Sequence, residues 1–168
     1  MDTPLTTTAP AFVAMAHGIG YAVVATIGRD GTPRTRVMQP VWEWDGTSLV
    51  GWVSTVDPSP KTRELAAVPE ASLTYWSPSQ DTCTATVVAT PVTAPAAKAE
   101  AWARFLATPA PAGFDPAIHP AWESPSSPTF GVLRLVPRSL RVQPGSLMLT
   151  GEGEILSWHA PAAAPAAR

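Results

Sequence analysis

Residues 51–65 read GWVSTVDPSPKTREL, and within this stretch the chain changes from one kind of secondary structure to another. The apolar segment Leu49–Ser54 predicts a β-strand. Ser59 is a favourable helix N-cap and Pro60 suits the first helical position, so we expect a helix over Lys61–Ala67. A strand that passes through a short loop into a helix therefore stands at the centre of the predicted fold.

The segments on either side predict an antiparallel sheet. Two strands precede the central stretch, Tyr21–Ile27 and Pro33–Trp44, with the turn dipeptide Asp30-Gly31 between them. The later strands are expected at Ala71–Trp76, Thr82–Val92, Phe130–Val136 and Ser139–Gln143, with a closing hairpin of Ser146–Thr150 and Glu154–Trp158. Strands in consecutive order with short interruptions favour a mainly β, α+β fold built on an antiparallel barrel.

Short helices and a long coil complete the predicted architecture. Helices are expected at Ala9–His17, capped by Thr8 after a frayed N-terminus, and at Ala94–Leu106. The proline-rich segment Thr108–Thr129 has no regular period and predicts a coil. Its aromatic residues could cover a pocket or lie across a second subunit; they are Phe114, His119 and Trp122. Residues 1–160 are expected to form a single domain, and residues 161–168 a disordered tail.

The composition excludes several classes of protein. The chain has 168 residues, 45% hydrophobic and only 14% charged, with a net charge of −2, which fits a globular domain without a general affinity for nucleic acid. Cys83 is the single cysteine, and the three histidines have no metal-binding spacing, so no metal site is predicted. We find neither a signal peptide nor an apolar run of membrane-spanning length, and we expect a cytoplasmic protein with no membrane partner.

Basic residues gather around the central stretch. Lys61 in the first turn of the predicted helix opposes the helix dipole unless an anion lies there; the alternative is a solvated helix start. Arg34 and Arg36 share one face of a predicted strand, where they suit a phosphate or, alternatively, are solvated at a sheet edge. The predicted strands Pro33–Trp44 and Leu49–Ser54 are joined by a short hairpin and are therefore neighbours. We therefore expect Arg36 and the helix start to converge on one phosphate.

The order of these motifs resembles the pyridoxamine 5′-phosphate oxidase-like FMN-binding split-barrel family. The resemblance rests on Arg36–Met38 in a strand, Ser54-Thr55 at a strand end, Ser59-x-Lys61 at a helix start, and then Leu65, Pro69 and Ala71–Trp76. Pro40–Glu43 and Asp81–Cys83 are similar to segments of uncharacterised actinobacterial members. The resemblance covers about Gly20–Pro95, with a looser similarity over Phe130–Trp158.

The resemblance implies an antiparallel split barrel that binds FMN at a homodimer interface. Carried over by position, Arg36 and Lys61 would hold the phosphate, helped by Ser59 and Thr62. The flavin ring and ribityl chain would be lined by Val37, Met38, Gln39, Ser54 and Thr55. Thr82 stands where the oxidase has a glutamine that reaches the flavin from the other subunit.

The implied function is an FMN-dependent oxidoreductase with a small-molecule substrate or electron donor that the sequence does not identify. No catalytic residue is predicted, because the flavin carries the redox chemistry. Oxidation of pyridoxamine phosphate itself is not expected, since only Trp158 and Arg168 could replace the oxidase's C-terminal substrate residues. The alternatives are a carrier or sensor that binds a flavin, a deazaflavin coenzyme or haem, with His17 as the candidate axial ligand, and a structural dimer without a working pocket.

Overall fold

The computed structural model describes residues 2–161 of the chain. Its strands are β1 (Ala22–Ile27), β2 (Pro33–Met38), β3 (Val41–Trp44), β4 (Leu49–Val56), β5 (Glu70–Trp76), β6 (Thr82–Pro91), β7 (Phe130–Gln143) and β8 (Leu156–His159). Its helices are α1 (Leu5–Ile19), α2 (Pro60–Ala67), α3 (Pro95–Ala107) and α4 (Gly145–Leu149), with a 3₁₀ turn, η1 (Pro116–Ile118).

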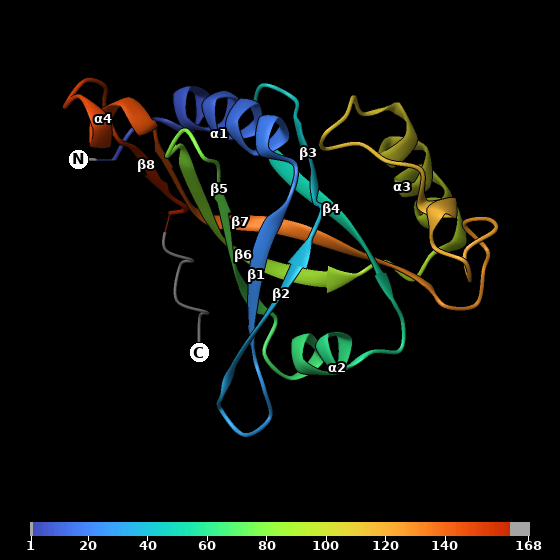
Figure 1. The fold of residues 1–168 in the computed structure, drawn as a ribbon. Helices are drawn as coiled ribbons and strands as arrows, with labels where there is room; N and C mark the ends of the chain where they lie inside the picture. The colour runs from blue at the N-terminus through green and yellow to red at the C-terminus, as the bar shows by residue number, and fades with distance from the viewer. Residues whose placement is uncertain (1, 162–168) are drawn as a thin grey trace.

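The strands form one antiparallel sheet that curves into a barrel. The hydrogen-bonded order is β2-β1-β5-β6-β7-β4-β3, and β8 pairs with β7 outside this path. The two end strands, β2 and β3, are separated in the chain only by Gln39 and Pro40, so the curved sheet brings its two ends together (Figure 1). The prediction of a mainly β, antiparallel split barrel with short peripheral helices is confirmed.

The barrel interior is filled by alternate residues of its strands. In β5, Ala71, Leu73 and Tyr75 are buried while the residues between them are exposed, which is the period-two pattern of a sheet with one covered face. Helix α1 covers one end of the barrel, where Phe12 meets Trp42 edge-on at 5.0 Å between ring centroids. Helix α2 lies at the opposite end (Figure 1).

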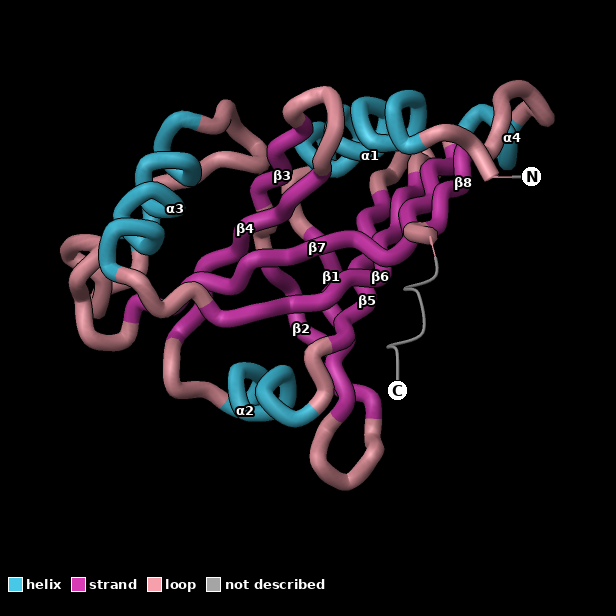
Figure 2. Tube along the Cα trace, turned by 180° about the vertical axis from the view of Figure 1, so that it is seen from behind, coloured by secondary structure: helices cyan, strands magenta, loops and turns pink. Residues whose placement is uncertain are grey.

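A second, smaller hydrophobic cluster lies outside the barrel. Helix α3 and the coil that follows it pack on the ends of β4 and β7, away from α4 and β8 (Figure 2). The buried members of this cluster are Val41, Ala101, Phe105, Trp122, Phe130 and Val132. The coil expected over Thr108–Thr129 is thus an ordered part of the domain, and η1 is the one regular turn assigned to it.

Two predicted strands are corrected by the structure. The single strand expected over Pro33–Trp44 is two strands, because Pro40 has no N–H to donate and interrupts the ladder. Its halves pair with different strands, β2 with β1 and β3 with β4. The expected break between Val136 and Ser139 is absent: β7 is continuous, with a register shift opposite Thr86/Val87.

The predicted ends of the chain also need correction. The N-terminus was expected to fray, but it is helical from Leu5. Thr8 is not the N-cap: it is a buried residue within the helix, and its hydroxyl donates to the Pro4 carbonyl. The closing hairpin is wrong, since Gly145–Leu149 is helix α4 and Leu156–His159 pairs with β7. The tail expected to be disordered lies, from residue 162 on, outside the described residues. Within residues 2–161 no helix is long and apolar enough to cross a membrane.

Candidate functional site

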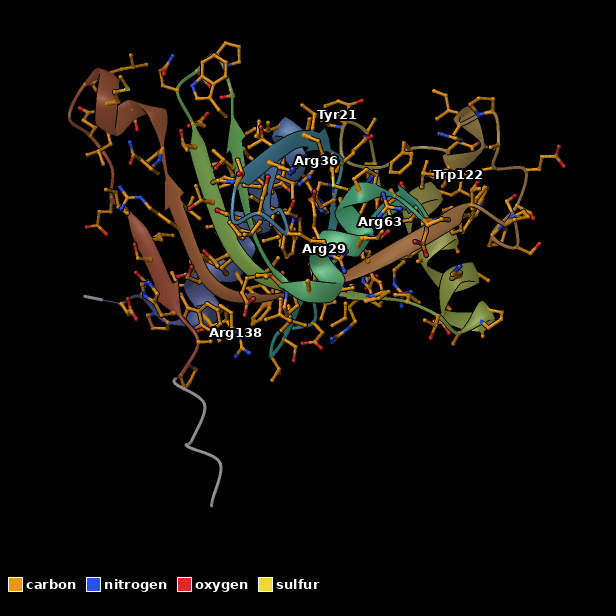
Figure 3. The ribbon with its side chains drawn as sticks, turned by 90° about the horizontal axis from the view of Figure 1, so that it is seen from below. Tyr21, Arg29, Arg36, Arg63, Trp122 and Arg138 are labelled. Carbon is orange, nitrogen blue, oxygen red and sulfur yellow. The ribbon has the colours of Figure 1, made fainter. Side chains whose placement is uncertain are left out.

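An open pocket of about 350 Å³ lies where β2, β4, α2 and the coil meet. We name its two sides by their chemistry. The basic wall consists of Arg36 and Lys61 with the strand-end residues Ser54 and Thr55, and the coil wall consists of Phe114, Ile118, His119 and Trp122. Tyr21, Val37, Met38, Gln39 and Val56 complete the lining. Figure 3, seen from the α2 side, shows Tyr21 and Arg36 on one side of this region and Trp122, on the coil, on the other.

A buried carboxylate holds Arg36 in the basic wall. Glu64 of α2 has a side chain only 7% exposed, and its Oε2 lies 3.0 Å from Arg36 Nη2. The Thr26 hydroxyl donates to the same oxygen at 2.6 Å and accepts from Arg36 Nη1 at 2.6 Å. The Thr26 hydrogen bond and the nearby Arg36 guanidinium lower the pKa of Glu64 from its usual 4.5. Arg36 is therefore oriented from inside the protein and has a counter-ion there.

Lys61 is the cation of this wall that lacks a counter-ion. Among the described residues its ammonium has no hydrogen-bond or ion-pair partner, although it lines the same pocket as Arg36. Burial and then the charge of Arg36 lower the pKa of Lys61, against a smaller opposing effect of Glu64. Burial and the charge of Arg36 both disfavour the charged form of Lys61, and an anion bound in the pocket would favour it. The basic wall thus suits a phosphate, with Lys61 as its uncommitted charge.

The start of α2 is stabilised internally. Ser59 is the N-cap, its hydroxyl accepting from the Thr62 N–H at 3.4 Å, while Thr62 Oγ1 accepts from the Ser59 N–H at 2.9 Å. This reciprocal capping arrangement satisfies two free N–H groups of the helix end. Neither residue lines the pocket. Their hydroxyls fix the direction of α2 and, with it, the position of Lys61.

The coil wall is anchored at both of its ends. Gln39 Nε2 donates to the Pro111 carbonyl at 2.7 Å, and the Asp57 N–H donates to the Thr129 carbonyl at 3.0 Å. Between these anchors Phe114 stacks on Phe105, with ring centroids 5.1 Å apart. His119 stacks on Trp122 at 4.3 Å. The aromatic residues of the coil line the pocket of their own chain, which is one of the two alternatives left open by the sequence.

The structure brings most of the predicted site residues together. Those that line the pocket are Arg36, Val37, Met38, Gln39, Ser54, Thr55 and Lys61. Ser59 and Thr62 lie behind it in the α2 cap. Thr82 lies elsewhere, in β6 opposite Trp76. The hairpin expected between the second and third predicted strands is present as β3–β4. It does not explain the convergence, because Arg36 lies in β2, which does not pair with β4; closure of the barrel brings Arg36 and Lys61 to one pocket.

Three lining residues were not predicted: Tyr21, Val56 and Ile118. Tyr21 is 56% exposed and Ile118 84% exposed, which is unusual for such large apolar side chains. In the sequence, however, they look like ordinary members of a strand and a coil. Only the closure of the barrel and the path of the coil place them at the pocket.

The candidate axial ligand His17 and the single cysteine both have structural roles. His17 Nε2 accepts from the Trp42 N–H at 2.9 Å, so the ring atom that would bind an iron already joins α1 to β3. Cys83 is buried in the barrel, and this burial raises the pKa of its thiol to about 12, as expected of a core residue and not of a nucleophile. Residues 2–161 contain no cluster of histidine, cysteine and carboxylate side chains that could hold a metal ion.

Fold and site together define a split-barrel protein with a pocket that is cationic on one side and aromatic on the other. Residues 8–143 match the family model described as pyridoxamine 5′-phosphate oxidase. The chain belongs to this family, and the resemblance inferred from the sequence motifs is confirmed. No curated protein matches the chain.

Solved structures share the fold at low identity. An FMN-binding protein related to pyridoxamine 5′-phosphate oxidase, from Nostoc punctiforme PCC 73102, is 17% identical with a TM-score of 0.65, over 95% of this chain and 92% of its own. A haem-binding protein from Mycobacterium smegmatis is 19% identical with a TM-score of 0.61, over 95% and 60%. An F420 reductase is 16% identical with a TM-score of 0.54, over 77% and 94%. At these identities the likeness concerns the fold alone.

Proposed function

We propose that the protein binds FMN in this pocket and acts as an FMN-dependent oxidoreductase. The observation that carries the proposal is Lys61, a partly buried cation that has no counter-ion within residues 2–161, beside Arg36, which is paired with Glu64. A phosphate placed against the basic wall would supply the missing negative charge. The FMN-binding neighbour with the same fold supports FMN as the source of that phosphate.

The rest of the pocket fits the remainder of the cofactor. Ser54 and Thr55, in the basic wall, add polar groups to the lining, and a ribityl chain needs hydrogen-bond partners of this kind. Val37, Met38 and the aromatic coil wall provide apolar surface for a planar ring. When bound, FMN would supply the electron-transfer chemistry. The chain's own residues would hold its phosphate, orient its ring and keep water from it.

The proposal includes a homodimer. The outer face of β1, β2 and β5 exposes Val23 by 48%, Val37 by 65% and Trp76 by 56%. These side chains lie among threonines, because Val23 is opposite Thr74 and Trp76 is opposite Thr82. Apart from Glu70 at the start of β5, the exposed residues of these three strands on this face are uncharged, and such a face suits a second copy of the chain. Thr82, on this face, would then approach the pocket of the partner and not its own.

The test is equilibrium dialysis of FMN with an absorption spectrum of the bound fraction. The Lys61→Ala variant is expected to weaken FMN binding about tenfold to a hundredfold, the loss of one charge-assisted contact. Arg63→Ala is the matched control, a cation on the same helix that does not line the pocket, and it should keep the wild-type affinity. Equal affinities for wild type and Lys61→Ala would contradict the site.

Further measurements test the identity of the cofactor and distinguish an oxidoreductase from a carrier or sensor. F420 and haemin are dialysed in parallel, since neighbours of the same fold are an F420 reductase and a haem-binding protein. Preferential binding of either would replace FMN as the cofactor. The bound FMN is then tested for reduction by a reduced nicotinamide and, after chemical reduction, for reoxidation by oxygen. Failure of both reactions would indicate a non-catalytic binder.

The dimer is tested separately by light scattering after gel filtration. Val23→Lys places a charge at the centre of the exposed face and is expected to give a monomer. The control is Leu106→Lys, the same kind of change at an exposed apolar residue of helix α3 that neither lies on this face nor lines the pocket. A wild-type protein that is monomeric at micromolar concentration would contradict the dimer.

A further inference from the structure

The coil wall contains a histidine, His119, that is held in place, and one of its two ring nitrogens has no hydrogen-bond partner among the described residues. His119 follows η1 directly, and its N–H donates to the Pro116 carbonyl at 3.1 Å while its carbonyl accepts from the Trp122 N–H at 2.9 Å. The imidazole stacks on the Trp122 ring at 4.3 Å between centroids, with 23° between the planes. Backbone and ring are therefore both held, although the residue belongs to a coil.

The hydrogen bond to one ring nitrogen sets the proton on the other. His119 Nδ1 accepts from the Ala121 N–H at 3.3 Å, so in the neutral ring Nδ1 carries no proton and Nε2 carries it. Nε2 has no hydrogen-bond partner among the described residues, yet it does not belong to the buried unpaired atoms. It is thus an accessible N–H donor on a side chain that lines the pocket.

The neighbouring indole is not an alternative donor. Trp122 Nε1 also lacks a partner, but it is buried and out of reach of solvent, and its ring packs edge-to-face on Phe130 at 5.2 Å. Trp122 therefore serves as the surface on which the imidazole is held. Of these two adjacent N–H groups, His119 Nε2 is the one that a ligand can approach without rearrangement of the cluster.

We infer that His119 is a ligand-binding residue whose Nε2–H donates to an acceptor on the uncharged, planar part of the bound molecule. The phosphate is directed to the basic wall on the other side of the pocket, so the acceptor belongs to the ring end of the ligand or to a second molecule beside it. A carbonyl oxygen is the acceptor chemistry that both sources share. This inference rests on the proposed function, because it assumes that the pocket between the two walls is the binding site.

The experiment follows the imidazole nitrogens of ¹⁵N-histidine-labelled protein by NMR. The free protein should show the Nε2–H form of His119. FMN is added first, and then acetophenone, a neutral aromatic carbonyl, is added to the FMN-saturated protein. A shift of Nε2 with FMN places the acceptor on the cofactor, and a shift only with acetophenone places it on a carbonyl substrate. No shift with either ligand overturns the inference.

Three variants measure what the contact contributes. His119→Phe keeps the stacking ring and removes the donor. It should lower the affinity for whichever ligand shifts the Nε2 resonance by about threefold to tenfold. His119→Gln places an amide N–H near the position of Nε2 and should restore most of the affinity. His159→Gln, at an exposed histidine paired with Asp2, should change nothing. Wild-type affinity in His119→Phe for both ligands overturns the inference.

Failure of the inference and failure of the proposed function have different signatures. If FMN binding is weakened by Lys61→Ala but not by His119→Phe, the proposed function stands. The inference is then overturned only if His119→Phe leaves acetophenone binding unchanged as well. If FMN does not bind, the proposed function falls, and the acetophenone titration on the cofactor-free protein decides about His119 by the same criterion. If His119→Phe does not fold, the Nε2 shifts of the wild-type protein decide.

Discussion

The two walls of the pocket are held in place by different forces. The basic wall stands on regular elements, and its arginine is fixed by a buried carboxylate and a threonine hydroxyl. The coil wall has almost no regular structure and is fixed by stacked aromatic rings and two anchoring hydrogen bonds. The comparison shows that an irregular segment can be as firmly placed as a helix when its side chains form a hydrophobic cluster of their own.

The difference also separates the tasks of the walls. Charge attracts and orients an anion over several ångströms, so the basic wall tolerates some variation in the position of the ligand. A neutral N–H contact requires a donor within about 3 Å and good alignment, so it needs a rigidly held ring. The stacking of His119 on Trp122 provides that rigidity. Four changes test this picture, from the largest expected effect to the smallest.

The largest effect is expected where the coil begins. A Cβ on Gly113 would clash with the backbone carbonyl of Thr108, so Gly113→Ala must open the turn that leads into Phe114. We expect a loss of about 3 kcal/mol or more in the free energy of unfolding, measured in urea. Gly18→Ala is the control, because its Cβ meets nothing within 4 Å and lies in helix α1. Equal stabilities of the two variants would show that the coil wall is loosely attached.

The second effect concerns the carboxylate behind the basic wall. Glu64→Gln leaves Arg36 without its counter-charge, and we expect a loss of about 2 kcal/mol at pH 7, less than for a fully buried pair because Arg36 is 23% exposed. The folded-state pKa of Glu64 is lowered, so its contribution is complete above its usual pKa of 4.5 and is lost as the pH falls through the lower folded-state value. Denaturation curves of wild type and variant should therefore converge in acid. A constant difference from pH 7 to pH 2 would contradict the assignment.

The third effect is the loss of the coil's anchor. Gln39→Ala removes the hydrogen bond to the Pro111 carbonyl, which should cost about 1 kcal/mol and speed hydrogen exchange of the Gly113 and Phe114 amides. The Gly113 amide donates to the Pro109 carbonyl in the coil, and the Phe114 amide donates to the Phe105 carbonyl in α3. Gln143→Ala, at the far end of β7, is the control and should leave those amides protected. Unchanged exchange in Gln39→Ala would mean that the aromatic stacking alone holds the coil wall.

The smallest effect on stability is expected at Lys61, with the opposite sign. Burial and Arg36 lower its pKa, so its charge is unfavourable in the free folded protein at pH 7, and this cost disappears as the pH rises towards the ordinary value of 10.5. Lys61→Met should therefore stabilise the free protein slightly, by at most about 0.5 kcal/mol, while it weakens FMN binding. A thermal melt with and without FMN measures both. Destabilisation of the free protein would show that Lys61 has a structural task.

The fold could be predicted where local rules act alone. The dipeptide Asp30-Gly31 forms the expected turn, in which Gly31 has a positive φ, the conformation that glycine adopts most easily. Ser59 and Pro60 begin α2 as expected. Both signals lie within a few residues of the structure they specify. The closing hairpin failed because no local signal distinguishes the short α4 from a strand of similar apolar content.

The candidate site could be predicted only in part. The basic residues around Lys61 were visible in the sequence because a cation at a helix start conflicts with the helix dipole. That Arg36 pairs with Glu64 was not visible, since the two are far apart in the chain and meet only when α2 packs against β1, the strand that pairs with β2. The place of His119 at the pocket depends in turn on the path of the whole coil.

The sequence by itself determined the class of fold, the turns, the start of α2 and the cluster of basic residues near it, because each depends on the chemistry of neighbouring residues. Only the tertiary structure decided which strands β2 and β3 pair with, which cation keeps a free charge, and which face of the coil meets the pocket. These depend on contacts between distant segments, whose partners are selected by barrel closure and side-chain packing.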